Sequence, residues 1–167
     1  MKKKSVLERV KIVPLKKKMG VIKELVALFR EGMAYFDEYE EDMVSELRDY
    51  FGGKRRDTHY FVAVLGGEII GLIGYLRYSN DVYNTGWFCI RKDLQGHGIG
   101  SLLLKFVERD LRGKARLLMV ECWDSAETCQ LLKFYRERGY RPAATLRNFY
   151  DDEDGDMTFF SKRIAKK

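Results

Sequence analysis

The segment that most restricts the fold is a glycine-rich heptapeptide, Gln95-Gly96-His97-Gly98-Ile99-Gly100-Ser101. It follows a β-rich run, 86–90, and opens the most regular apolar stripe in the chain, which predicts a helix over 98–111. Glycines allow a tight turn and a close backbone approach to a ligand. A helix start adds N–H groups without intrahelical acceptors and the positive end of the helix dipole. We therefore expect a phosphate or pyrophosphate site; the alternative is a glycine-rich turn that binds nothing.

Two common phosphate-binding signatures do not fit this segment. A Walker loop ends in Gly-Lys-Ser/Thr, whereas here Ser101 follows Gly100 directly. A dinucleotide fingerprint, G-x-G-x-x-G, would place its third glycine at Ser101 or at Leu103, depending on its start. The spacing that does fit is Q/R-x-x-G-x-G/A, read from Gln95 to Gly100.

The rest of the chain predicts a single domain over 1–167, of mixed α/β (α+β) class. Apolar periodicity predicts further helices over 18–36, within the acidic stretch 37–49, and over 126–138. The predicted strands are 9–15, 59–65, 68–78, 86–90, 116–122, 143–149 and 157–163, with Gly66-Gly67 as a two-residue hairpin turn. This order indicates a mostly antiparallel sheet of six to seven strands flanked by four helices.

The formal net charge of +6 is concentrated at the start of the chain. Residues 1–18, a basic arm with the first strand, hold eight of the 31 basic side chains and one of the 25 acidic ones. The remaining residues carry 23 basic and 24 acidic side chains, so the body is close to neutral. A nucleic-acid-binding domain needs a basic face on the folded body. Nucleic-acid binding through the arm is therefore the less favoured alternative.

Cysteine use and hydropathy favour a cytoplasmic protein. Cys89, Cys122 and Cys129 form no C-x-x-C pair, so we expect buried apolar thiols rather than disulfides or a zinc ribbon. The longest apolar run, 69–76, is too short to span a bilayer, and the basic start is not followed by a signal-peptide core. No metal is expected, because neither histidine has a cysteine or an acid at ligand spacing.

Three segments together resemble the GNAT acetyltransferase superfamily. Gln95-x-x-Gly98-x-Gly100 fits the family's Q/R-x-x-G-x-G/A loop. The run 131–140, LLKFYRERGY, is similar to the family's A-x-x-x-Y-x-x-x-G-F helix. The segment 147–157, RNFYDDEDGDM, is similar to the tail of the protein Nα-acetyltransferase branch. The resemblance covers residues 5–163 in order.

This resemblance implies an acetyl-CoA-dependent N-acetyltransferase. In the family, the loop amides hold the pyrophosphate of acetyl-CoA, and the backbone of the preceding strand pairs with pantetheine. The matching cofactor-binding positions are Cys89, Ile90, Gln95, Gly96, His97, Gly98, Ile99, Gly100 and Ser101. Thr128 stands where the family often has an asparagine that bonds the cofactor.

The resemblance also implies two catalytic residues for direct attack of an amine on the thioester. An alkylamine has a pKa of about 10, so a base or a water relay must remove a proton, and the departing thiolate needs a proton donor. Tyr135 matches the family's acid; its alternative role is an amphipathic core tyrosine. Glu121 is the candidate base, because related Nα-acetyltransferases place a glutamate on this strand at a slightly different spacing. Its alternative is a surface acid at a strand end.

The sequence leaves the acceptor amine open among a protein N-terminus, a lysine side chain, a polyamine and another small amine. The resemblance of 147–157 favours peptide N-termini. The acidic stretches 37–49 and 151–156 either attract a cationic acceptor or are solvated surface. A non-catalytic acyl-CoA-binding regulatory module is a rival function on the same fold, and both a monomer and a homodimer are compatible with the sequence.

Overall fold

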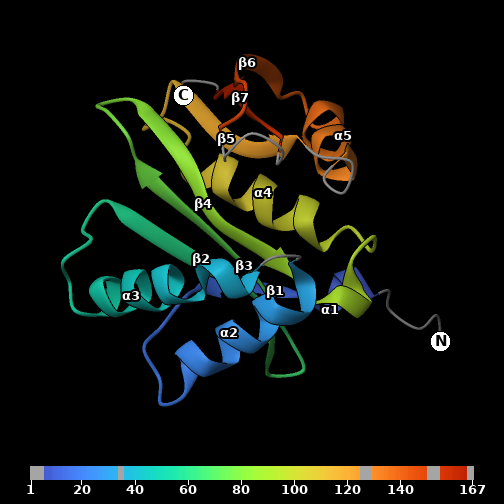
Figure 1. Cartoon of the computed structure of the whole chain (residues 1–167). Helices are drawn as coiled ribbons and strands as arrows, with labels where there is room; N and C mark the ends of the chain where they lie inside the picture. The colour runs from blue at the N-terminus through green and yellow to red at the C-terminus, as the bar shows by residue number, and fades with distance from the viewer. Residues whose placement is uncertain (1–5, 34–35, 125–128, 150–154, 165–167) are drawn as a thin grey trace. The chain divides into compact units, whose positions relative to one another are not determined.

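A computed structural model describes residues 6–33, 36–124, 129–149 and 155–164 (Figure 1). The chain divides into two compact units. The first contains residues 1–76 and 86–110, and the second contains residues 77–85 and 111–167. Strand β4 (Val82–Ile90) contributes its first half to the second unit and its second half to the first. The prediction of a single domain stays a prediction.

The first unit is built from strands, four α-helices and two 3-10 turns. The strands are β1 (Lys11–Pro14), β2 (Thr58–Leu65), most of β3 (Glu68–Arg77) and the end of β4. The helical elements are α1 (Val6–Arg9), α2 (Val21–Gly32), η1 (Phe36–Tyr39), α3 (Glu40–Phe51), η2 (Lys92–Leu94) and α4 (Ile99–Asp110).

The predicted β2–β3 hairpin is confirmed. Gly66 and Gly67 have φ values of 63° and 95°, which is the left-handed backbone that a two-residue turn of this kind requires. The turn sets the antiparallel register in which Leu65 pairs with Glu68. The continuous apolar run in β3 is buried on both faces from Ile70 to Tyr75, as its lack of alternation predicted.

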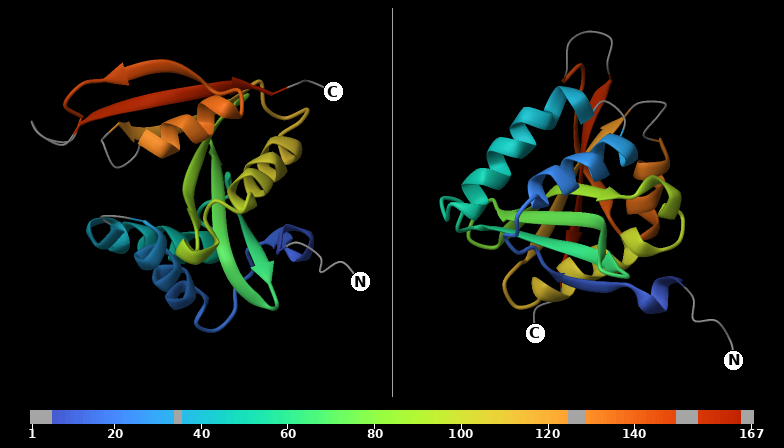
Figure 2. Two further views of the ribbon diagram at one scale, coloured as in Figure 1. Left: turned by 90° about the vertical axis from the view of Figure 1, so that its right-hand side faces the viewer. Right: turned by 90° about the horizontal axis from the view of Figure 1, so that it is seen from below.

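Helices cover both faces of the strands in the first unit (Figure 2). On one side, α2 and α3 contribute Leu25, Phe29 and Leu47 to a core that also contains Tyr60 of β2. On the other side, α4 packs Phe106 against Phe61, with ring centroids 4.9 Å apart. This double cover fixes the direction in which β4 enters the glycine loop that precedes α4.

The second unit places one helix against a small sheet. Its elements are the start of β4, β5 (Leu117–Asp124), α5 (Cys129–Glu137), β6 (Arg141–Leu146) and β7 (Asp156–Arg163). The start of β4 pairs with β5 in parallel over three residue pairs, from Val82↔Leu117 to Asn84↔Met119. β7 then pairs with both β5 and β6 in the antiparallel sense. Gly139, at φ 84°, ends α5 as predicted.

Hydrogen bonding links the seven strands in the order β1-β2-β3-β4-β5-β7-β6, which confirms the predicted fold class. Most boundaries differ from the prediction by three residues or fewer, and two differ by four. β4 begins at Val82 rather than at position 86, because the residues from Val82 to Asn84 find partners on β5. α2 ends at Gly32 rather than at position 36. Within the described residues, no helix has the length and apolar character needed to cross a membrane.

Candidate functional site

The glycine loop lies at the surface of the first unit and leads directly into α4. Gly96 and Gly98 have φ values of 77° and 84°, so both use backbone conformations that side chains disfavour. Gln95, Gly96 and His97 are exposed, whereas Ile99 is 1% exposed and anchors the start of the helix. The loop therefore presents backbone groups to solvent on a fixed support, which is what an anion-binding helix start requires.

The Gln95 side chain holds this loop in place from within. Its Nε2 donates to the carbonyl of Ile90 at 3.0 Å and to the carbonyl of Gly32 at 3.1 Å. The first acceptor ends β4 and the second ends α2, so one amide ties two elements to the loop. The sequence predicted that Gln95 binds the cofactor through the loop; the structure gives its side chain a supporting role.

Gly32 is a position at which no side chain fits. A Cβ there would lie 2.5 Å from Cys89 Sγ and 2.7 Å from the Ile90 carbonyl oxygen. The absence of a Cβ lets the end of α2 pack directly against the end of β4. The sequence analysis missed Gly32, because it lies inside the predicted helix over 18–36, where a single glycine does not indicate a functional contact.

Cys89 and Ile90, the predicted pantetheine-pairing positions, lie side by side at the end of β4. Cys89 is 6% exposed, and its Sγ faces the carbonyls of Leu28 and Ile90 at 3.8 and 3.6 Å. Burial raises the pKa of the Cys89 thiol to about 12, so the thiol is neutral at physiological pH. Because both residues are buried, neither side chain is available to a ligand.

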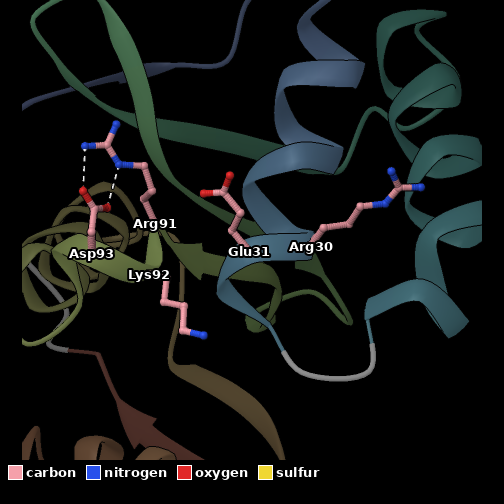
Figure 3. A pocket seen from close by; sticks show the side chains of 5 residues that line it. All are labelled: Arg30, Glu31, Arg91, Lys92 and Asp93. Atoms are coloured by element: carbon pink, nitrogen blue, oxygen red, sulfur yellow. Dashed lines mark hydrogen bonds and ion pairs between the residues drawn. The ribbon is translucent and has the colours of Figure 1, made fainter.

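Charged residues surround an open depression of about 840 Å³ next to the ends of α2 and β4 (Figure 3). Arg30 and Glu31 come from α2, and Arg91, Lys92 and Asp93 follow β4. Arg91 Nε donates to Asp93 Oδ1 at 2.8 Å, and this contact holds the pKa of the Asp93 carboxyl below its usual range. Arg30 points away toward α3, where it pairs with Glu40 at 2.6 Å. The sequence analysis assigned none of these residues to a site.

Glu121, the candidate base, is exposed on β5 and receives a hydrogen bond from β4. Asn84 Nδ2 donates to Glu121 Oε1 at 2.7 Å. Asn84 is 9% exposed, and its Oδ1 meets no donor from the described part of the chain. A buried acceptor without a donor costs about 1–3 kcal/mol. The sequence analysis missed Asn84, because the β4–β5 register that places it there was not predicted.

Tyr135, the candidate acid, lies on α5 in an aromatic cluster of the second unit. It is 3% exposed, and its ring centroid lies 5.5 Å from that of Tyr140 and 6.4 Å from that of Phe160. Burial, with a smaller contribution from Cys122, raises the pKa of the Tyr135 phenol above its ordinary value. The hydroxyl therefore stays protonated at neutral pH. Both roles, a catalytic acid and a core tyrosine, require a protonated hydroxyl, so the raised pKa does not distinguish between them.

Residues 89–90 and 95–101, the predicted cofactor positions within the described residues, all belong to the first unit, and the Gln95 side chain links the loop to the end of β4. Glu121 and Tyr135 both belong to the second unit. Thr128 lies outside the described residues, as does the acidic segment 151–154. Cys122 is 1% exposed, which confirms its predicted burial. Among the described residues there is no cluster of three or more metal-binding side chains, and the expectation of no metal stays a prediction.

Comparison with known proteins places these features in one domain family. The family described as Acetyltransferase (GNAT) domain matches residues 56–142 of the 167-residue chain. The matched range contains the glycine loop, Glu121 and Tyr135. An uncharacterised N-acetyltransferase of Methanocaldococcus jannaschii is 24% identical over 109 residues, which cover 65% of this chain and 69% of the relative.

Solved structures share the fold over nearly the whole chain. A protein of Desulfovibrio desulfuricans described as a GNAT-family acetyltransferase has a TM-score of 0.83 at 22% identity, covering 93% of this chain and 99% of that one. An aminoglycoside 6′-N-acetyltransferase complexed with coenzyme A has a TM-score of 0.77 at 15% identity, covering 94% and 98%. The ribosomal-protein-S18-alanine N-acetyltransferase of Escherichia coli has a TM-score of 0.73 at 18% identity, covering 95% and 96%.

Proposed function

The chain belongs to the GNAT acetyltransferase family, and we propose that it moves the acetyl group of acetyl-CoA to a primary amine by direct attack. The observation that carries the proposal is the exposed loop of Gln95–Ser101, with left-handed glycines at the start of α4, inside the range that matches the family. A similar fold complexed with coenzyme A supports the choice of co-substrate.

The residues present fit the pyrophosphate of acetyl-CoA. The loop is exposed from Gln95 to His97, and a Cβ at Gly96 would meet nothing within 4 Å, so a ligand can approach the backbone. The first α-helical bond after the loop runs from the Leu102 N–H to the Gly98 carbonyl, so the amides of Ile99 and Gly100 lie in the first turn, where helix geometry supplies no acceptor. His97 is exposed in this loop, and its Nδ1–H donates to the Gln95 carbonyl.

The proposed base is Glu121. Its carboxylate is exposed, and one oxygen is already oriented by Asn84 at 2.7 Å. An ammonium proton transferred to this carboxylate leaves the nitrogen lone pair free to attack the thioester carbonyl carbon. The chain thus supplies a fixed acceptor for the proton that the amine must lose.

The proposed acid is Tyr135. As the carbon–sulfur bond breaks, the thiolate of coenzyme A takes up a proton, and a phenol with a raised pKa is fully in the donor form at neutral pH. The same raised pKa makes Tyr135 a weak acid, so its contribution is a hydrogen bond that strengthens as negative charge develops on sulfur.

For the acceptor we propose a peptide N-terminus, with lysine side chains, polyamines and small amines as the other members of the class. This choice rests on the resemblance of 147–157 to protein Nα-acetyltransferases and on the similar fold of an enzyme that acetylates the alanine of ribosomal protein S18. Another similar structure belongs to an aminoglycoside acetyltransferase, so aminoglycosides are included in the test. The proposed reaction releases the free thiol of coenzyme A, which agrees with the expected cytoplasmic location.

The test is an assay of coenzyme A thiol release from acetyl-CoA with a panel of amines: N-terminal peptides, N-acetylated lysine peptides, polyamines and aminoglycosides. We expect amine-dependent release that is greatest with a peptide N-terminus and absent when that terminus is blocked. Binding of acetyl-CoA without release above hydrolysis for every amine would support the non-catalytic module instead. No binding of acetyl-CoA at millimolar concentration would reject both.

A further inference from the structure

Among the described residues of the second unit, Asn84 is a buried polar residue whose Oδ1 accepts no hydrogen bond. Its side chain lies where β4 and β5 run in parallel, opposite Met119, and reaches the residue two positions further along β5, which is Glu121. In a strand, residues two apart share a face, so Asn84, Met119 and Glu121 lie on the same side of the sheet. On that side Glu121 is exposed, whereas the intervening β5 residues Val120 and Cys122, on the other side, are fully buried.

The chemistry of the pair fixes the orientation of the Asn84 amide. A carboxylate can only accept hydrogen bonds, so Nδ2 must face Glu121 and Oδ1 must face elsewhere. That Oδ1 is buried and meets no donor from the residues that the structure describes. A side chain selected for packing alone would be a leucine of the same shape, which has no such unmet acceptor.

We propose that Asn84 is a positioning residue for the acceptor amine: Nδ2 orients the Glu121 carboxylate, and Oδ1, which is buried before the amine binds, accepts an N–H of the ammonium group once the side chains that cover Oδ1 move aside. The proposal rests on the acetyltransferase function proposed above. A primary ammonium has three N–H donors, so it can bond Oδ1 and Glu121 together while a third proton remains outside. One N–H proton then passes to the Glu121 carboxylate, which becomes a carboxylic acid, and the nitrogen keeps the electron pair for attack.

The arrangement selects for an unblocked primary amine. A secondary amide or an acetylated terminus has one N–H at most, and it is neutral, so it cannot serve both acceptors. Asn84 Oδ1 therefore accepts a hydrogen bond only when a cationic amine is bound. If a water molecule rather than the amine bound Oδ1, substitution of Asn84 would not change amine turnover.

The experiment compares Asn84→Leu and Asn84→Ala with the wild-type chain, using the best amine from the panel. We expect kcat/KM for the amine to fall by about tenfold or more in both variants, while KM for acetyl-CoA changes less than about twofold. We also expect the Tm of Asn84→Leu to equal or exceed that of the wild type, since the leucine removes an unmet acceptor and Glu121 is solvated.

Thr158→Val is the matched control. Thr158 is 4% exposed in the same unit, its hydroxyl bonds that of Thr145 at 3.1 Å, and it pairs with Cys122, on the other face from Glu121. We expect its kcat/KM for the amine to stay at the wild-type value. Amine kcat/KM within about threefold of wild type in both Asn84 variants would overturn the inference but leave the acetyltransferase function standing. Absence of turnover in the wild type with every amine would overturn both.

Discussion

The glycine loop of the first unit and the Asn84–Glu121 pair of the second unit depend on the sequence in different ways. The loop offers backbone groups, and its glycines are required by φ values of 77° and 84° that local sequence dictates. The pair offers side chains from two residues that are 37 positions apart in sequence. They meet only because the parallel register of β4 and β5 places Asn84 opposite Met119, two residues before Glu121. Backbone chemistry can therefore be recognised in a short motif, whereas side-chain chemistry between strands depends on the tertiary fold.

The largest expected effect comes from placing a charge in the loop. We expect Gly98→Glu to abolish the rise in Tm that acetyl-CoA produces, because a carboxylate within the loop would repel the pyrophosphate and the left-handed backbone would be strained. Gly20→Glu is the control, since Gly20 has φ 78° and open space around it but lies outside the loop. Thermal melts with and without acetyl-CoA measure both. A retained shift in Gly98→Glu would remove the loop from cofactor binding.

The next effect tests side-chain chemistry in the second unit. We expect Tyr135→Phe to lower kcat by about 100-fold while acetyl-CoA affinity is unchanged, because the donor to the developing thiolate is lost. Tyr140→Phe is the control, as Tyr140 is fully buried in the same aromatic cluster. Steady-state kinetics with the preferred amine provide the measurement. Equal turnover in Tyr135→Phe and wild type would assign Tyr135 to the core alone.

A smaller effect is expected when the hydrogen bonds of the Gln95 side chain, which hold the loop, are removed. In Gln95→Glu, a carboxylate would face the carbonyls of Gly32 and Ile90 in place of a donor, so the loop loses its anchor. We expect acetyl-CoA affinity to fall by about tenfold and the Tm to fall by a few degrees. Gln130→Glu adds the same charge at an exposed position and should change neither. Titration calorimetry gives the affinities. Equal acetyl-CoA affinities in Gln95→Glu and Gln130→Glu would contradict the role of Gln95.

An alkaline effect follows from Tyr60, a buried tyrosine of the first unit. Burial, followed by its hydrogen bond to Glu46, raises the pKa of Tyr60 in the folded chain. The protonated phenol is favoured in the fold, so its contribution to stability is complete below pH 10 and is lost as pH rises above 10. The free energy of unfolding should fall by up to about 1.4 kcal/mol per pH unit there. In Tyr60→Phe, the slope above pH 10 should be shallower, which denaturant titrations at several pH values measure.

The smallest expected effect concerns the basic arm. Deletion of residues 1–4 removes three lysines, yet the acetyl-CoA site is expected to rely on the loop backbone rather than on net charge. We expect the Kd for acetyl-CoA to change by less than about twofold at physiological salt, where the Debye length is about 8 Å. A marked loss of affinity would mean that the arm contributes to the site.

Local patterns predicted most of the fold. The hairpin at Gly66-Gly67, the buried strand that follows it, and the helix after the loop all depend on residues close in sequence. The start of β4 was missed because Asn80–Asn84 contains turn-forming residues, and its pairing with Leu117–Met119 supplies the stabilisation that local propensity lacks. Propensity is overridden where a distant strand provides hydrogen-bond partners.

The candidate site divides in the same way. The glycine loop could be singled out from its spacing, and the family resemblance implied the cofactor positions 89–90 and 95–101, which belong to one unit. Gly32, the Gln95 anchor and Asn84 could not, because each is defined by a contact across 37 to 63 positions of sequence. Such contacts leave no local pattern, and a supporting glutamine looks the same in sequence as a ligand-binding one.

The central claim is that the loop backbone binds acetyl-CoA, and the glycine pair Gly96 and Gly53 tests it most directly. The two residues have φ values of 77° and 76°, and a Cβ at either would meet nothing within 4 Å, so Gly96→Ala and Gly53→Ala carry the same conformational strain. Titration calorimetry of acetyl-CoA should show a Kd raised by about tenfold or more for Gly96→Ala and an unchanged Kd for Gly53→Ala. Equal affinities in the two variants would contradict the account.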